Sequence, residues 1–246
     1  MNNPTVEQTD APEIFQIKSR FTGKVQFECE LSAEVADMSF SIKLGFAVKK
    51  AIEARANLAG AYLADANLAG ANLADANLAG AYLAGANLDG AYLAGAYLAG
   101  AYLADANLAD ANLADANLAG AYLAGANLDG AYLADAYLAG ANLARANLAD
   151  AKWRNDIILK RAPLQIFNLF YPVTILDMHM QIGCELHLIS EWREFDNERI
   201  ARMNGVDSRR FWKKHRDALL ALADSDGRGV EENQTDAVEE DGQEEA

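Results

Sequence analysis

Residues 56–150 repeat with a period of five, in nineteen consecutive units that read Ala-(Asn/Tyr)-Leu-(Ala/Asp)-(Gly/Asp/Arg). A leucine stands third in every unit, from Leu58 to Leu148. An α-helix needs apolar residues at a period near 3.6, and a strand needs them at a period of two. Neither element can therefore run through this segment. The alanine and leucine of a unit point the same way, as in a very short strand, and the remaining residues turn a corner. Repetition of such a unit predicts a solenoid, in which each repeat contacts only its neighbours.

The unit resembles that of the pentapeptide-repeat proteins, whose signature is a small residue, Asn or Asp, Leu, and two variable polar residues. The resemblance covers about 95 of the 246 residues. It implies an all-β solenoid core, namely a right-handed quadrilateral β-helix with one pentad per side and four pentads per coil. Small α+β flanks would then cap the two ends of the stack.

A twenty-residue coil sorts the residues that precede the leucines into four columns. One column holds Tyr62, Tyr82, Tyr102, Tyr122 and Asn142, and the next holds only asparagine, at positions 67, 87, 107, 127 and 147. The other two columns mix asparagine and tyrosine. We interpret the Asn column as structural, because stacked amides can bond along the column and to nearby backbone. The Tyr column is explained by ring stacking at one strand separation, about 4.8 Å, or alternatively by a recognition surface.

The aspartates of the repeat lie on three of the four sides. Asp105 is on the Tyr side, Asp110 on the Asn side and Asp115 on the third side. The fourth side is uncharged, and its units end in glycine at positions 60, 80, 100, 120 and 140. These glycines either ease a corner at positive φ or provide a flat side that covers a flanking segment or a second subunit. The predicted binding surface comprises Tyr62, Tyr82, Tyr102, Tyr122, Asp105, Asp110 and Asp115.

Part of the column pattern arises from a forty-residue repeat in the sequence. Residues 61–100 and 101–140 differ at only two positions, where glycine in the first copy becomes Asp110 and Asp135 in the second. A duplication of forty residues reproduces any pattern of sides automatically. It therefore weakens the argument that each side was selected separately.

Composition and charge predict four parts. These are an N-terminal hairpin and helix cap (1–55), the solenoid (56–151), a C-terminal α+β flank (152–223) and a disordered acidic tail (224–246). The net charge is −15, and nine aspartates against one arginine give residues 56–150 a net charge of −8. The chain has only two cysteines and no long apolar run, so we expect a reduced, cytoplasmic protein without a membrane span.

The N-terminal flank reads as strands followed by a helix. Residues 14–20 and 25–31 are predicted to form a hairpin around a short glycine-bearing turn, and residues 38–44 a third strand. A helix over 48–54 is expected to cover the open edge of the first coil.

The C-terminal flank is expected to contain strands over 157–160 and within 163–180, and helices over 190–203 and 207–223. In the last helix, Phe211, His215, Ala218, Leu219 and Leu222 are predicted to share one side, with Trp212 at its edge. The opposite side carries Arg209, Arg210, Lys213, Lys214 and Arg216. We interpret this basic side as solvent-exposed, and binding of nucleic acid or another anionic partner is the alternative.

One set of residues has the composition of a metal site. His179, Cys184 and His187 could share a zinc ion, but a fourth ligand is not evident unless Cys29 supplies it from the other flank. A buried cysteine with strand-end histidines is the simpler interpretation. The sequence contains no phosphate-binding glycine loop and no recognisable catalytic set. We therefore predict no metal, no cofactor and no catalysis.

The flanks carry a second resemblance, to uncharacterised pentapeptide-repeat proteins of phages and prophages. It rests on residues 17–23, residues 181–184, Glu191-Trp192-Arg193, Phe195-Asp196 and Phe211-Trp212. Some pentapeptide-repeat proteins act as duplex-DNA mimics towards type II topoisomerases. The resemblance of the flanks implies a phage-related origin and architecture and no particular activity. The resemblance of the repeat implies a non-catalytic protein-binding scaffold in a bacterial host cell, and it suggests inhibition of a host DNA-binding protein by acidic surface mimicry.

The expected partner is thus a host or phage protein, and neither a membrane nor direct contact of nucleic acid with the acidic solenoid is expected. Two alternatives remain open. The first is a structural or assembly protein that forms a homodimer through a solenoid face or a flank, and the second is a metal-binding C-terminal domain.

Overall fold

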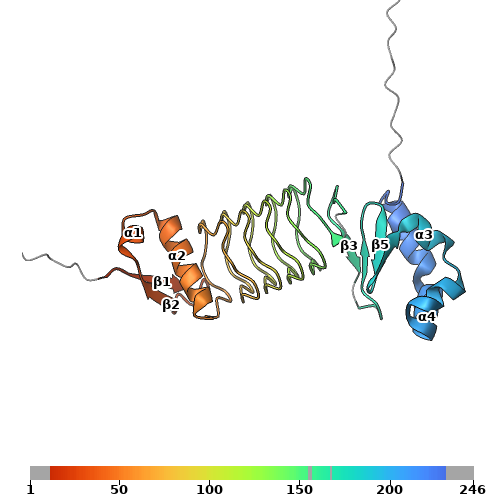
Figure 1. Cartoon of the computed structure of the whole chain (residues 1–246), viewed down its shortest axis with the longest axis horizontal. Helices are drawn as coiled ribbons and strands as arrows, with labels where there is room; N and C mark the ends of the chain where they lie inside the picture. The colour runs from red at the N-terminus through yellow and green to blue at the C-terminus, as the bar shows by residue number, and fades with distance from the viewer. Residues whose placement is uncertain (1–11, 155–156, 167, 231–246) are drawn as a thin grey trace, which may run out of the picture. The chain divides into compact units, whose positions relative to one another are not determined.

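The computed structural model describes residues 12–154, 157–166 and 168–230. The described residues form two compact units, which divide between Ala162 and Pro163 (Figure 1). The pentads lie in the first unit, together with an N-terminal hairpin and two helices. Among the described residues, no helix is both long and apolar enough to cross a membrane.

The N-terminal flank is a hairpin followed by helices. Strand β1 (Ile14–Lys18) pairs antiparallel with β2 (Val25–Glu30), as predicted. Helix α1 (Ala33–Ala36) and helix α2 (Phe40–Glu53) follow. The third strand predicted over 38–44 is wrong, because Ser39 caps α2 by accepting a hydrogen bond from the Ile42 N–H.

Backbone hydrogen bonds join the pentads into a stack of twenty-residue coils. Parallel bridges connect each residue that precedes a leucine to the residue twenty positions later, from Tyr62↔Tyr82 to Tyr132↔Lys152. Around Tyr102, for example, Leu83 N donates to Tyr102 O at 2.7 Å and Tyr102 N donates to Ala81 O at 2.9 Å. The leucines from Leu58 to Leu138 are at most 6% exposed. They fill the interior of the stack.

The fifth residue of each pentad forms the corner. Its φ lies between 50° and 72° throughout the repeat. Glycine adopts this left-handed region freely, and aspartate and asparagine adopt it more readily than other residues. The exchange of Gly for Asp at this position is therefore a consequence of backbone geometry, and Arg145 is the exception.

Helix α2 lies across the first coil of the stack (Figure 1). Asn67 N donates to Ser41 O at 3.0 Å, and Ser41 Oγ donates to Asp65 O at 2.6 Å. The buried residues of the helix are Leu44, Gly45, Ala47, Val48 and Ala51. The hairpin adds a further pairing, because Tyr62 N donates to Lys18 O at 2.8 Å. Backbone groups of the first coil are thus paired with the N-terminal flank.

The stack continues beyond residue 151, where the sequence placed its end. Lys152 bridges to Tyr132, and the Trp153 side chain is 1% exposed at the place that leucine holds in other pentads. The chain then turns back, so that Ile158 bridges antiparallel to Lys152 and Leu159 N donates to Ala151 O at 2.8 Å. The coil pattern thus extends to Trp153. In place of the strand expected over 157–160, the structure has the single bridge between Ile158 and Lys152.

The second unit is an antiparallel sheet covered by two helices. Its strands are β3 (Leu164–Ile166), β4 (Val173–Ile175), β5 (His179–Ile182) and β6 (Glu185–Leu188), which pair in chain order. The helices are α3 (Ile189–Glu194) and α4 (Asn197–Ser225). The core consists of Val173, Ile175, Met180, Ile182, Ile189, Trp192, Ile200, Phe211, Trp212, Leu219, Leu220 and Ala223.

The helices differ in detail from the prediction. The helix expected over 190–203 is interrupted, because Asp196 begins α4 by accepting from Arg199 N at 2.7 Å. Helix α4 itself is broken at Asn204 and Gly205, whose φ and ψ are not helical. Ala218 and Leu222 are exposed, whereas Leu220 and Ala223 are buried. The buried stripe of α4 therefore lies nearer to Trp212 than expected.

The predicted disordered tail begins too early. Residues 224–230 are described, and Arg228 is only 2% exposed. Its Nη1 donates to Ile175 O at 3.0 Å and its Nε donates to Asp226 at 2.7 Å. The first residues after α4 thus pack against the sheet. The rest of the tail, 231–246, lies outside the described residues.

Candidate functional site

The four tyrosines of the predicted surface form one continuous column of rings. Tyr62 and Tyr82 have centroids 5.3 Å apart, Tyr82 and Tyr102 5.9 Å, and Tyr102 and Tyr122 4.5 Å. The first and last pairs are stacked, with interplanar angles of 15° and 17°. Ring stacking between coils therefore holds these side chains in place.

An arginine of the N-terminal flank covers the middle of this column. The Arg20 guanidinium lies 4.2 Å from the Tyr102 centroid and 5.9 Å from that of Tyr82. Such a cation over a ring face is attracted by the ring's quadrupole. Tyr82 and Tyr102 are accordingly half-buried, whereas Tyr62 and Tyr122 are 50% and 46% exposed. Sequence reasoning missed Arg20, because its position depends on how the hairpin docks.

Other tyrosines of the solenoid are equally accessible. Tyr92, Tyr97, Tyr132 and Tyr137 lie on the two mixed columns, and their exposed fractions range from 36% to 58%. Each is separated from the next tyrosine of its column by an asparagine. The exposed aromatic surface of the solenoid is therefore wider than the predicted Tyr column.

The three predicted aspartates stand at successive corners of one coil. Asp105, Asp110 and Asp115 are exposed and have φ values of 56°, 53° and 57°. They belong to three different columns, so the fold does not gather them into one patch. Asp105 and Asp110 extend over Gly125 and Gly130 of the next coil, where an added Cβ would collide with the Oδ1 atom.

The Asn column has the structural role that we predicted. Along it, Asn107 Nδ2 donates to Asn87 Oδ1 at 3.5 Å, Asn127 to Asn107 at 3.1 Å, and Asn147 to Asn127 at 2.9 Å. Each Oδ1 also accepts the backbone N–H two residues later, as Asn107 does from Ala109 at 3.2 Å. This local bond stabilises the turn.

The uncharged fourth side of the solenoid, here called the glycine side, packs against part of the N-terminal flank. A Cβ on Gly60 would lie 2.7 Å from the Phe21 ring, and one on Gly80 would lie 3.9 Å from it. At Gly100, Gly120 and Gly140, an added Cβ would meet nothing within 4 Å. Both explanations of these glycines therefore apply. All five have the positive φ of a corner, and Gly60 and Gly80 also pack against the Phe21 ring of the flank.

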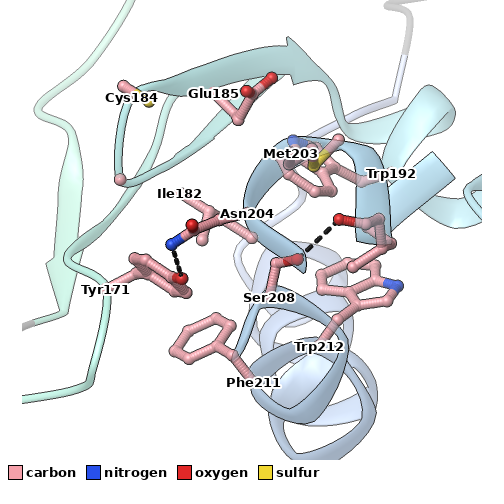
Figure 2. A pocket seen from close by; sticks show the side chains of 12 residues that line it. Tyr171, Ile182, Cys184, Glu185, Trp192, Met203, Asn204, Ser208, Phe211 and Trp212 are labelled. Atoms are coloured by element: carbon pink, nitrogen blue, oxygen red, sulfur yellow. Dashed lines mark hydrogen bonds between the residues drawn. The ribbon is translucent and has the colours of Figure 1, made fainter. Parts of the chain in front are cut away.

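A cavity of ≈ 250 Å³ opens in the second unit between the β5–β6 turn and helix α4 (Figure 2). Its walls are mainly aromatic and aliphatic, and include Trp192, Phe211 and Trp212. Among the described residues, the Trp212 Nε1 atom is buried without a hydrogen-bond partner. Two other polar groups in Figure 2 are bonded within the protein, since Asn204 Nδ2 donates to the Tyr171 hydroxyl and Ser208 Oγ donates to Ile200 O. These two bonds stabilise the interruption of α4, and neither of them orients a reactive group.

The histidines of the suggested zinc set do not converge. Strand pairing places His187 opposite Met180 and His179 opposite Leu188. Adjacent residues of a strand point to opposite faces of the sheet, so His179 and His187 face away from each other. Cys184 is exposed in the intervening turn. Among the described residues, no group of three His, Cys, Asp or Glu could hold a metal ion.

Burial gives His179 a role in pH-dependent stability. Desolvation lowers its pKa below the ordinary value of 6.5, although Glu191 acts in the opposite direction, and Nδ1 has no hydrogen-bond partner in the described part of the chain. The unfolded chain therefore binds the proton more readily than the folded chain. The contribution of His179 to stability is complete above pH 6.5 and is lost as the pH falls below that value.

We expect the urea midpoint of the second unit, followed by the fluorescence of Trp192 and Trp212, to fall as the pH decreases below about 6.5. The substitution His179→Gln should reduce this pH dependence, because glutamine does not titrate. The same pH dependence in the variant would contradict the assignment.

The fold and its outward side chains define a repeat solenoid with a polar and aromatic surface. The family model for pentapeptide repeats matches residues 56–95, 91–130 and 116–152, with eight copies. The chain therefore belongs to the pentapeptide-repeat proteins. A comparison with curated proteins found no match.

Several solved pentapeptide-repeat structures are similar to this chain. One, from Nostoc, is 29% identical over 50% of this chain and 92% of its own, with a TM-score of 0.34. One from the thylakoid lumen of Arabidopsis thaliana is 32% identical over 41% and 70%, with a TM-score of 0.25. One from the cyanobacterium Cyanothece is 36% identical over 31% and 59%, with a TM-score of 0.18.

Proposed function

We propose that this chain is a non-catalytic protein-binding scaffold, whose solenoid presents tyrosines and aspartates to a macromolecular partner. The observation that carries the proposal is the combination of exposed side chains with a bonded backbone. Tyr92, Tyr97 and Tyr122 are 46% to 58% exposed, while hydrogen bonds between coils fix the residues that carry them. A preorganised surface loses little conformational entropy on binding.

The residue types also suit a protein interface. Tyrosine is enriched in protein interfaces, since it provides a large contact area and a hydroxyl group. The exposed carboxylates at the corners add electrostatic complementarity towards a basic partner. We take the partner to be a host or phage protein, and the solenoid to be a right-handed quadrilateral β-helix, as the family resemblance implies.

A finer proposal is that the acidic solenoid inhibits a host DNA-binding protein in the cytoplasm of a bacterium, as a phage- or prophage-related protein. Nineteen pentads are about 4.75 coils and about 23 Å long at sheet spacing. A DNA duplex of that length carries about 13 charges, whereas residues 56–150 carry a net charge of −8. The acidic sides therefore supply little more than half of the charge of DNA, and a mimic would have to rely on shape as well.

DNA supercoiling by a bacterial type II topoisomerase tests this mimicry. We expect the purified chain to inhibit supercoiling at micromolar concentration, and the triple variant Asp105→Asn, Asp110→Asn, Asp115→Asn to inhibit at least about tenfold less, because three charges are removed. Asparagine also accepts the left-handed corner conformation, so the fold should be retained.

The matched control is the triple variant Glu30→Gln, Glu34→Gln, Glu194→Gln, which removes three exposed charges outside the solenoid. It should inhibit like the wild type. If the wild type does not inhibit at any soluble concentration, or if both triple variants lose activity equally, mimicry by the solenoid is wrong.

Assembly through the glycine side is the second candidate function. It is favoured by the open surface at Gly100, Gly120 and Gly140, where the described residues leave space around an added Cβ. A second copy could pack on this uncharged side. Light scattering of the purified chain tests this candidate, because assembly predicts a dimer or a larger species and a strict monomer at high concentration would contradict it.

A further inference from the structure

Helix α4 carries a group of cations that the rest of the described chain does not neutralise. Arg209, Lys213 and Lys214 are exposed and have no ion pair or side-chain hydrogen bond among the described residues. Within the described ranges, Arg210 pairs only with Asp207, at 3.2 Å, and the two side chains are 74% and 54% exposed. An exposed pair of this kind is weak and open to competition by another anion.

A cavity of ≈ 230 Å³ lies beside two of these cations, Arg210 and Lys214, between α4 and the loop that precedes β4. Arg210, Lys214 and His215 line it from the helix, and Asn168 and Phe170 line it from the loop. Positive charge, hydrogen-bonding groups and an aromatic ring therefore meet at one concave place. The other lining residues are Leu169, Asp207 and Phe211.

Phe170 is the most unusual member of this cavity. Its side chain is 71% exposed, although burial of a phenylalanine would be strongly favourable. The ring is held by an edge contact with Tyr171, at 4.8 Å between centroids, and Tyr171 in turn contacts Phe211 of α4 at 5.2 Å. The loop thus holds an apolar ring in solvent, next to the cations.

We propose that this basic cavity binds single-stranded nucleic acid. A base stacks on the Phe170 ring, and the flanking phosphates bind Lys214 and Arg210, which releases Arg210 from Asp207. Alternation of stacking platforms with cations is how proteins bind single strands without sequence preference. Asn168 and His215 line the same cavity and supply groups that can hydrogen-bond the edge of the stacked base.

The geometry favours a single strand over two other anionic partners. The bases of a duplex are already stacked on each other, so a duplex offers no free base to Phe170. An acidic protein segment would pair with the cations but has no planar base for the ring. The cavity is also smaller than most pockets for complete cofactors, which fits one base with its phosphate.

Binding should depend on short-range contacts. The chain as a whole carries a charge of −15, so it does not attract a polyanion from a distance. At physiological salt, charges beyond about 8 Å are largely screened, and the local cations then dominate. This proposal concerns the second unit and does not depend on the function proposed for the solenoid.

Fluorescence anisotropy of a labelled short oligothymidylate, titrated with the full chain at several salt concentrations, tests the proposal. We expect saturable binding that weakens with salt. Phe170→Leu should weaken it at least about tenfold without changing the salt dependence, because it removes stacking and no charge. Lys214→Gln should also weaken binding and reduce the slope of log K against log salt by about 0.7.

Lys49→Gln, which removes an exposed charge from α2 in the first unit, is the matched control and should bind like the wild type. Phe170 and Lys214 are exposed, so neither substitution should unfold the chain, and circular dichroism checks this. The proposal is overturned if the wild type does not bind, if Phe170→Leu binds normally, or if duplex DNA or polyglutamate competes as well as the unlabelled oligonucleotide.

Discussion

Replacing Gly45 with alanine is expected to separate helix α2 from the first coil. A Cβ on Gly45 would overlap the Asn67 carbonyl oxygen and lie 2.8 Å from its carbonyl carbon. Both are backbone atoms, so no side-chain rotation can relieve the contact. We expect a loss of about 2 kcal/mol or more in the stability of the first unit, since overpacking of this kind outweighs the gain in helix propensity.

The loss should be accompanied by self-association. Undocking of α2 exposes the apolar residues of the helix and backbone groups of the first coil, and such edges pair with other chains. Urea unfolding by circular dichroism measures the stability, and light scattering measures the association. Gly70→Ala is the matched control, because Gly70 has φ 61° but open space around it, so it should show only the smaller cost of the left-handed conformation. Equal effects of the two substitutions would contradict the close contact at Gly45.

Leu103→Ala is expected to destabilise the solenoid by about 2–5 kcal/mol, the range for a buried leucine whose surroundings cannot collapse. Leu103 is 0% exposed, and the coils above and below fix its neighbours through backbone bonds. Each coil contacts only adjacent coils, so a cavity in the middle weakens the coupling between the two halves. Hydrogen exchange should show increased opening on both sides of Leu103.

Leu143→Ala provides the comparison, because Leu143 is only half-buried. It should cost clearly less than Leu103→Ala, as less apolar area is removed from water in the folded state. Equal losses of stability would contradict the structure, in which Leu103 is more deeply buried than Leu143.

The repeat was largely predictable because one local rule applies many times. The five-residue period identified the leucine interior and the column membership, and hence the amide ladder through Asn87 and Asn107. The same twenty-residue coil also predicted that the rings of the Tyr column would stack. The accessibility of the rings did not, since Arg20 comes from a separate hairpin.

The errors arose where local patterns compete. Met38, Phe40, Ile42 and Leu44 alternate as in a strand, but only Leu44 is buried. A helix forms there instead, because Ser39 caps it and the residues at 44, 47, 48 and 51 share a buried face. The sequence placed the end of the solenoid at residue 151, yet Trp153 fills a leucine position where the chain folds back through Leu159.

The second unit was less predictable because its contacts depend on strand register. His179 and His187 are close in sequence, and only their pairing with Leu188 and Met180 shows that they face opposite sides. The cavity beside Phe170 joins a loop to a helix that begins many residues later. No periodicity in the sequence indicates that contact.

The most direct test of the scaffold function is quantitative capture of bacterial proteins on the immobilised chain. Three samples are compared, namely the wild type, the solenoid variant Asp105→Asn, Asp110→Asn, Asp115→Asn, and the control variant Glu30→Gln, Glu34→Gln, Glu194→Gln. We predict that at least one protein is retained by the wild type and the control but lost from the solenoid variant. Retention of the same proteins in the same amounts by both variants, or of none by the wild type, would contradict a binding function of the solenoid surface.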